Sequence, residues 1–459
     1  MQAATVPKGQ QQAALWVSTF AFTVCFAVWT IFSIIGIRIK AELGLNDTQF
    51  GLLIAMPILT GSLSRLALGI WADQFGGRIV MTLVMLAAAA ATWALTQVST
   101  YPGFLIAALF VGIAGGSFSV GIAYVSKWFP KEKQGTALGI FGAGNVGAAV
   151  TKLLAPMVMV AAGWQRVAEL WAIAIAVTAV LFFLLTKDDP SHTARKVAGH
   201  KPVGFIDQLA PLKNIQVWRF SLYYFFVFGA FVALALWLPR YLIGVYGLDV
   251  ATAGMIAAMY SIPASVFRIV GGWLSDKIGA RAVMYWTFSV SAIVCFILSY
   301  PSTNYVVHGI QGDIAFTLAI GVIPFTVLVF VLGFFMSLGK AAVYKHIPVY
   351  YPDHVGSVGG IVGLIGGLGG FVLPIAFGAM NDLIGVWTSC FMLLFVLVAA
   401  ALAWMHFAIR RMERARFPQI KGETDLPEII RAAESDASGS AIEPVRASGR
   451  GMGPTQAHA

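Results

Sequence analysis

The chain has 459 residues, of which 59% are hydrophobic and 11% charged, and its formal net charge is +10. In soluble globular domains roughly a quarter of the residues are charged, so this composition excludes a water-soluble globular protein. The basic excess does not indicate nucleic-acid binding, because many basic residues lie in short segments between apolar runs, as the positive-inside rule describes.

Twelve apolar runs follow one another along the chain. A run of about 20 residues crosses the hydrocarbon core of a membrane as a helix. We therefore predict an all-α membrane protein with about twelve transmembrane helices. The predicted spans are 14–37, 48–72, 79–97, 102–126, 135–162, 167–186, 216–239, 250–274, 282–300, 315–338, 356–380 and 386–409.

The spans fall into two sets of six, separated by the longest polar interruption. We predict an N-terminal tail over 1–13, a six-helix half over 14–186, a cytoplasmic linker over 187–214 and a second half over 215–409. Residues 410–459 are rich in Ala, Gly, Ser, Pro and charge. A segment with so little apolar surface to bury is expected to be a disordered tail.

Loop charges predict the orientation of the chain in a cell inner membrane. The linker and the loops on its side carry most of the Lys and Arg, whereas the opposite loops offer only Arg38, Lys40, Arg166 and Arg240. Because cytoplasmic loops hold the excess of Lys and Arg, we expect both termini in the cytoplasm and lipid around the spans.

The two halves repeat a loop motif. Residues 69–78 read GIWADQFGGR after the second span, and residues 272–281 read GWLSDKIGAR after the eighth. The same shift of 203 residues relates Asp73 to Asp276 and Arg78 to Arg281. Repeated halves are common in secondary transporters, whose substrate site lies between them near the middle of the membrane.

This loop resembles the motif of the major facilitator superfamily, and the resemblance covers residues 14–409. It implies the major facilitator fold, with gating roles for the motif residues Asp73, Arg78, Asp276 and Arg281.

Two arginines lie inside spans, which is costly unless they face a partner or a polar cavity. Arg65 is in the second span and Arg268 in the eighth, and the shift between them is again 203 residues. The spans offer almost no acid to pair with them. Two guanidinium groups at equivalent depth indicate an anion site, since the guanidinium fork matches planar oxyanions. The alternative is that each arginine bonds backbone carbonyls or extends toward the membrane surface.

Other side chains have suitable chemistry for completing such a site. Asn145 has an amide that can donate to an oxyanion, and Tyr224 has a hydroxyl that can do the same. Phe118 and Tyr344 can enclose a flat ligand, although core packing is the alternative role for both.

Spans five and eleven are unusually rich in glycine at spacings of three and four. Such spacing predicts a face without side chains, which lets helices approach closely. Residues 115–147, which begin GGSFSVGIAYVSKWFP and end GAGNVG, resemble the first nitrate signature of the nitrate/nitrite porter (NarK/NasA-type) family. Residues 356–370, GSVGGIVGLIGGLGG, resemble the second signature.

This second resemblance implies roles for the residues named above. The family's substrate arginines correspond to Arg65 and Arg268, its signature asparagine to Asn145 and its pocket tyrosine to Tyr224. Its stacking aromatics correspond to Phe118 and Tyr344. Lys152, Lys340 and Lys345 depart from the family's simple exchangers, whose spans tend to be uncharged there.

We therefore expect a carrier that takes up nitrate by alternating access, with nitrate/proton symport coupled through Lys152 or Lys345. Nitrate/nitrite antiport is the alternative, and a carrier for another small anion is the next. No cluster of His, Asp and Glu with ligand spacing occurs in the spans, so we expect no enzyme, metal or cofactor. We also expect the carrier to act as a monomer.

Overall fold

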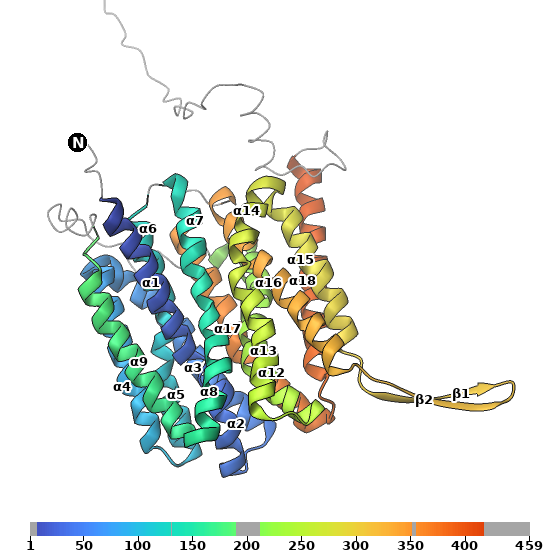
Figure 1. The fold of residues 1–459 in the computed structure, drawn as a ribbon. Helices are drawn as coiled ribbons and strands as arrows, with labels where there is room; N and C mark the ends of the chain where they lie inside the picture. Colours follow the sequence, from blue (N-terminus) through green and yellow to red (C-terminus); the bar gives the residue numbers. More distant parts are fainter. Residues whose placement is uncertain (1–6, 130, 190–211, 351–354, 417–459) are drawn as a thin grey trace, which may run out of the picture. The chain divides into compact units, whose positions relative to one another are not determined.

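The computed structural model describes residues 7–129, 131–189, 212–350 and 355–416, with no account of the side chains of 73, 131–135, 348–350, 355–357 and 412–416. The predicted linker therefore lies largely outside the described residues, as do the N-terminal tail over 1–6 and the C-terminal tail from 417. The prediction of an all-α membrane fold is confirmed, and the described residues add one β-hairpin to the helices (Figure 1).

The first half holds six spans, three of which contain short 3₁₀ segments. Its elements are α1 (Lys8–Trp29), α2 (Phe32–Leu43), α3 (Asp47–Phe75), α4 (Gly77–Ala94), η1 (Leu95–Gln97), α5 (Tyr101–Val111), η2 (Gly112–Gly116), α6 (Ser117–Ser126), α7 (Lys131–Gly142), η3 (Ala143–Val146), α8 (Gly147–Ala162) and α9 (Trp164–Leu185).

The second half begins with a span that contains a π-helical turn. Its elements are α11 (Ile215–Tyr224), η5 (Phe225–Ala230), α12 (Phe231–Tyr246), α13 (Val250–Val266), α14 (Arg268–Ile278), α15 (Ala280–Leu298), β1 (Thr303–Gly309), β2 (Gly312–Leu318), α16 (Val322–Tyr350), α17 (Val355–Ile384) and α18 (Ser389–Arg416).

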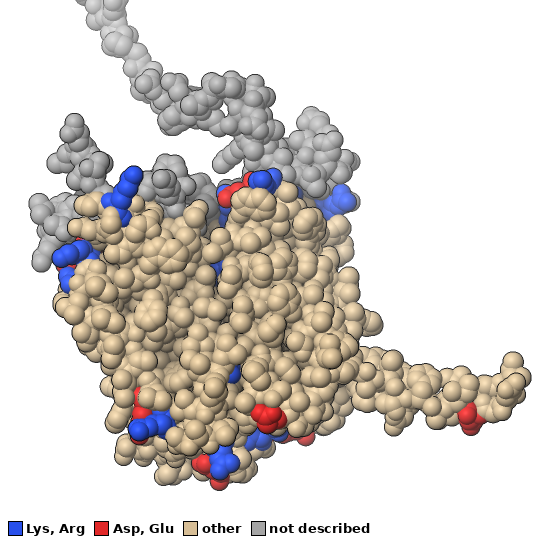
Figure 2. Space-filling view, viewed as in Figure 1, with Lys and Arg blue, Asp and Glu red and all other residues tan. Residues whose placement is uncertain are grey.

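The described helices supply eleven segments long and apolar enough to cross a membrane, and the bent pair α13 and α14 supplies a twelfth. Figure 2 shows the matching charge distribution: Lys, Arg, Asp and Glu gather near the two ends of the helices, and the surface between them is almost free of charge. That belt carries large exposed apolar side chains such as Leu83, Phe110 and Phe296, as expected of a surface that faces lipid.

The halves meet through two helix pairs, and the internal repeat relates one pair to the other. In the first pair, α3 of the second span packs on α17 of the eleventh; in the other, α8 of the fifth packs on α13 of the eighth. Glycine allows both approaches, because Gly51 lies against the backbone of Pro374 and Gly254 against the backbone of Lys152. Shifting each half by six spans turns one pair into the other.

Two predicted spans are broken rather than continuous. The first consists of α1 and α2, separated at Thr30 and Ile31, and extends to Leu43. The eighth, predicted as one helix over 250–274, bends by 40° between α13 and α14. Pro263 lacks the backbone N–H of a regular helix and sits in the last turn of α13, so a bend at this position is the expected consequence.

Some predicted boundaries were also wrong. The tenth span does not run over 315–338, because residues 303–318 form the hairpin and α16 extends from Val322 to Tyr350. The run is apolar but alternates in the strand pattern, and Gly312 adopts a positive φ of 127° at the turn. At the other end, α18 continues to Arg416, so residues 410–416 belong to a helix and not to the predicted tail.

Candidate functional site

Arg65 lies in the middle of α3 and is 4% exposed. Its guanidinium carbon is 5.7 Å from the ring centre of Trp29, 5.2 Å from that of Phe118 and 5.1 Å from that of Phe228. Nη1 donates a hydrogen bond of 3.1 Å to the carbonyl of Gly363, whereas Nε has no partner among the described residues. The side chain is therefore enclosed by aromatic faces with donor capacity left over.

Hydrogen bonds stabilise the start of α3 and hold one ring beside Arg65. Asn46 caps α3 by accepting from the N–H of Gln49 at 2.7 Å, and Gln49 Oε1 accepts from the N–H of Asn46 at 3.0 Å. This reciprocal capping box stabilises the first turn. Further along, the carbonyl of Pro57 accepts a 2.8 Å hydrogen bond from the indole of Trp29, which holds that ring beside Arg65.

Arg268 is the first residue of α14, directly after the bend in the eighth span. It is 8% exposed, and its guanidinium carbon is 5.7 Å from the ring centre of Phe118 and 5.9 Å from that of Tyr344. Its Nη1 has no hydrogen-bond partner in the described ranges. Because Phe118 is close to both guanidinium groups, the structure brings the two repeat-related arginines, one from each half, to the same ring.

No carboxylate forms an ion pair with either arginine in the described part of the chain. Two buried positive charges without a carboxylate are electrostatically unfavourable. A small anion that accepts hydrogen bonds from both would offset that cost and would use the donors that lack partners. We refer to Arg65 and Arg268 as the arginine pair.

The predicted tyrosines lie beside the arginine pair. The rings of Tyr224 and Tyr344 meet edge to face, with their centres 5.0 Å apart, and Tyr224 stacks on Phe228 at 5.1 Å. The Tyr344 hydroxyl donates to the carbonyl of Gly359 at 3.1 Å. Tyr224 is fully buried at the end of α11, directly before the π-helical turn η5.

Asn145 lies in η3, the short break between α7 and α8, and is fully buried. Neither Oδ1 nor Nδ2 has a hydrogen-bond partner within the described residues. Gly142, three residues earlier, lies against the Arg268 guanidinium, since a Cβ built on it would be 3.3 Å from Cζ and Nε. Asn145 thus adds donor and acceptor capacity three residues from the glycine that lies against Arg268.

The glycines of spans five and eleven do more than the predicted helix packing. Gly369 lies against Gly229, as expected of a close helix contact. Gly142 instead faces Arg268. A Cβ on Gly367 would meet Ser62 Oγ at 2.5 Å and would lie 3.4 Å from Arg65 Nη1. Each arginine therefore has a glycine of the opposite half beside it, an arrangement that follows the repeat.

The two candidate coupling lysines lie in different environments in the structure. Lys152 is fully buried on α8, and its Nζ donates to the carbonyl of Ala148 at 3.0 Å. Lys345 is not brought to the arginine pair; it is partly exposed and forms an ion pair with Asp276. Lys340 also departs from the pattern of the family's simple exchangers. It is buried, with Nζ 2.8 Å from the Ala264 carbonyl and 3.1 Å from the Phe231 ring centre.

The loop motifs make contacts inside each half. Arg78 donates to the carbonyl of Phe183 from Nε at 3.1 Å and from Nη2 at 2.5 Å, and lies 3.8 Å from Asp188. Asp276 pairs with Lys345 in the second half, where Arg281 is buried. The side chain of Asp73 lies outside the described residues, so its gating role stays a prediction, as do those of the other three.

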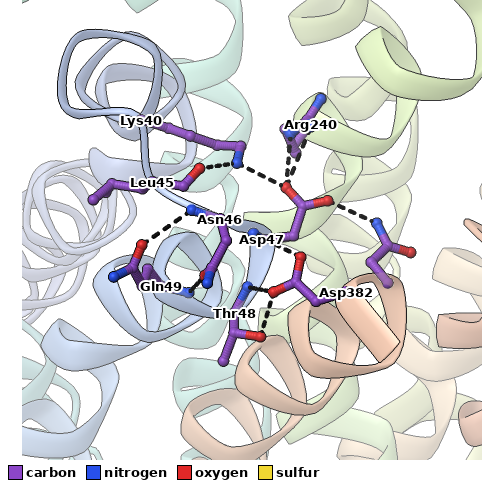
Figure 3. Close-up of polar contacts among 9 residues, drawn as sticks. Lys40, Leu45, Asn46, Asp47, Thr48, Gln49, Arg240 and Asp382 are labelled. Carbon is purple, nitrogen blue, oxygen red and sulfur yellow. Dashed lines mark hydrogen bonds and ion pairs between the residues drawn. The ribbon is translucent and has the colours of Figure 1, made fainter. Parts of the chain in front are cut away.

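A second polar cluster joins the halves at the end of the helices opposite to the start of α1 (Figures 1 and 3). Asp47 Oδ1 lies 3.1 Å from Lys40 Nζ and 3.2 Å from Arg240 Nη2. Asp382 Oδ1 accepts from the N–H of Asp47 at 3.1 Å, and Oδ2 accepts from the N–H of Thr48 at 2.7 Å. We call these residues, with Asn381, the inter-half network.

Sequence reasoning did not select Trp29 and Phe228, although both rings contact Arg65. Both are single aromatic residues in apolar runs, where nothing separates a site residue from a packing residue. Only the position of the arginine in space reveals them.

Comparisons with known proteins show the family to which the chain belongs. Residues 17–326 and 246–446 match the model of the Major Facilitator Superfamily. The chain is 43% identical over 427 residues to the probable nitrate/nitrite antiporter NarK1 of Thermus thermophilus. The aligned residues cover 90% of this chain and 95% of that protein. It is 32% identical over 409 residues to the probable nitrate transporter NarT of Staphylococcus aureus strain Newman, covering 89% and 97% of the two chains.

One solved structure with the same fold is a bacterial homolog of the human lysosomal transporter Spinster, in an inward-facing and occupied conformation. Its TM-score is 0.66 at 16% identity, over 88% of this chain and 98% of that one. The fold and the repeated halves thus define a carrier of the major facilitator superfamily. Within that superfamily, the chain belongs to the nitrate/nitrite porter (NarK/NasA-type) family.

Proposed function

We propose that this carrier takes up nitrate by alternating access and that protons move with it. The observation that carries the substrate assignment is the arginine pair, two buried guanidinium groups from different halves beside one ring, Phe118. The names of the NarK1 and NarT relatives, which refer to nitrate, support the same substrate.

The planarity of nitrate suits this site. A guanidinium group presents parallel N–H donors to two oxygens of a planar oxyanion, and two such groups satisfy its three oxygens. The faces of Phe118 and Tyr344 enclose a flat ligand better than a tetrahedral one. A larger organic anion would have to displace these rings, which makes a carrier for another anion the weaker candidate.

The position of the site between the halves supports alternating access. Rocking of one half against the other exposes a central site to each side of the membrane in turn. The inter-half network holds the halves together at one end in this conformation, through Asp47 and Asp382. We propose that this end faces outward and that both termini are cytoplasmic, because the loops beside the linker carry the basic excess.

Charge balance motivates the coupling to protons. Nitrate is the anion of a strong acid, so its entry into a negative cell interior requires a compensating ion. The arginines cannot exchange protons usefully. A buried lysine can alternate between charged and neutral forms, and Lys152 is fully buried with a backbone carbonyl as its hydrogen-bond partner. Lys345 is less suitable, because it pairs with Asp276 away from the arginine pair.

Nitrate/nitrite exchange is the second candidate, favoured by the name of the Thermus relative. Uptake into proteoliposomes separates the two. Symport predicts that an inward proton gradient drives nitrate uptake without internal nitrite, and that Lys152→Met removes this dependence. Uptake that ignores the gradient and requires trapped nitrite would contradict symport and leave exchange. Failure to transport nitrate under either condition would contradict the substrate assignment itself.

A further inference from the structure

The hairpin between α15 and α16 has two chemically different faces. Its antiparallel register pairs Tyr305 with Phe316 and Val307 with Ile314, and the Tyr305 and Phe316 rings stack at 5.4 Å. These four residues form one face, which we call the apolar hairpin face. All four are exposed, Ile314 to 60% and Phe316 to 48%.

Two of the three pairs on the opposite face are polar, and the pair between them is Val306 with Ala315. The Thr317 hydroxyl donates to Asn304 Oδ1 at 2.7 Å, and His308 Nδ1 lies 2.6 Å from Asp313 Oδ1. Residues alternate between the faces of a strand, so the sequence of the hairpin encodes an amphipathic element. Residues 303–318 contain no Lys or Arg.

The position of the hairpin places it at the membrane surface. Four residues connect it to the end of α15 and three connect it to the start of α16, so it stays close to the ends of two membrane spans. It runs sideways from the helices instead of continuing along them (Figures 1 and 2). The neighbouring surface of α15 and α16 is lipid-facing, with Phe296 62% exposed and Ile323 75% exposed.

Neither water nor hydrocarbon alone suits such a hairpin. An isolated two-stranded hairpin is marginal in water, and exposed apolar strands favour aggregation. Inside the hydrocarbon, the unpaired N–H and C=O groups of its open edges would lack partners. The membrane–water interface satisfies both faces, because amphipathic elements there place the apolar side toward the acyl chains and the polar side toward water.

We propose that residues 303–318 are an interfacial anchor, with the apolar hairpin face seated in the lipid at the membrane surface on the same side as the inter-half network. The occupant we assign to this face is the acyl-chain region of the lipid, since the hairpin adjoins the lipid-facing surface of α15 and α16. With no Lys or Arg in the hairpin, the seating is driven by apolar contact and does not require anionic headgroups.

Spin labels on the two faces test this proposal in the full-length carrier in phosphatidylcholine nanodiscs. Phe316→Cys places the label on the apolar face, and Thr317→Cys, its neighbour, places it on the polar face. The three native cysteines are buried, so the introduced thiol is the one that reacts. We expect the ratio of collisions with oxygen to collisions with an aqueous nickel reagent to be roughly threefold or more higher at 316 than at 317.

Ile314→Cys and Ala315→Cys should repeat the pattern, and added phosphatidylglycerol should leave it unchanged. Equal access of the nickel reagent to 316 and 317 would show a hairpin that stands in water and would overturn the proposal. Protection of 316 from both reagents, with line broadening that grows with protein density, would show contact with a second copy and would also overturn it. Seating that appears only with anionic lipid would contradict an apolar anchor. These readouts do not depend on which ion is transported.

Discussion

At the residue scale, the proposed chemistry depends on the planar shape of the two arginine side chains as well as on their charge. Arg65→Lys and Arg268→Lys keep the charge but replace a planar fork by a point charge. Loss of one hydrogen bond to a charged group costs about 1.5–3 kcal/mol, so uptake at low nitrate should fall about tenfold to a hundredfold in each variant. Initial rates in proteoliposomes measure this.

Arg166→Lys is the matched control, because Arg166 is exposed and pairs with Glu169 within α9. It should transport nitrate at the rate of the unchanged carrier. Near-normal uptake by Arg65→Lys or Arg268→Lys, at equal amounts of protein in the membrane, would remove that arginine from the proposed site.

Asn145 should affect affinity more than turnover. Its amide is fully buried, and both polar atoms lack partners among the described residues. If the amide donates to nitrate, Asn145→Ala should weaken the apparent affinity by about tenfold or more, which is the effect of losing one such hydrogen bond. The nitrate concentration at half-maximal uptake measures this, and an unchanged value would place Asn145 outside the site.

At the element scale, the glycines next to the arginines should be sensitive to size. Gly142 faces the Arg268 guanidinium, whereas a Cβ on Gly139, one turn earlier in α7, would meet nothing within 4 Å. Gly142→Leu should therefore displace Arg268 and abolish most nitrate uptake. Gly139→Leu changes the same helix by the same side chain and should be tolerated. Equal activity of the two variants would mean that the space beside Arg268 is not needed.

Most of the helices, and the equivalent positions of the two arginines, could be predicted from the sequence. The 203-residue repeat predicted that Arg65 and Arg268 occupy equivalent positions, and the structure brings both to Phe118. The bend before Arg268 and the hairpin at 303–318 were missed. Hydrophobicity over a long window does not register a local break at Pro263, and it cannot separate an apolar strand from the start of a helix.

At the scale of the whole molecule, the inter-half network should control which side of the carrier is open. Arg240 of α12 bonds Asp47 of α3, so Arg240→Ala removes a charged contact between the halves. A charge-assisted bond contributes about 1.5–3 kcal/mol, less when partly exposed, so the equilibrium should shift about threefold to tenfold toward opening at this end.

Distances between spin labels on Leu43→Cys and Leu383→Cys follow this opening, because both positions are exposed at the ends of helices of different halves. The population of long distances should grow in Arg240→Ala. Arg38→Ala is the control, since Arg38 pairs with Glu42 inside α2. Identical distance distributions in all three carriers would show that the network does not hold this end closed.

The central claim is that one nitrate binds between both arginines, and calorimetric titration of the purified carrier with nitrate tests it most directly. We predict one nitrate bound per chain in the unchanged protein and in Arg166→Lys, with the binding heat lost in Arg65→Lys and also in Arg268→Lys. Binding of two nitrates per chain, or binding of unchanged affinity in either of these two variants, would contradict a single site shared by the two halves.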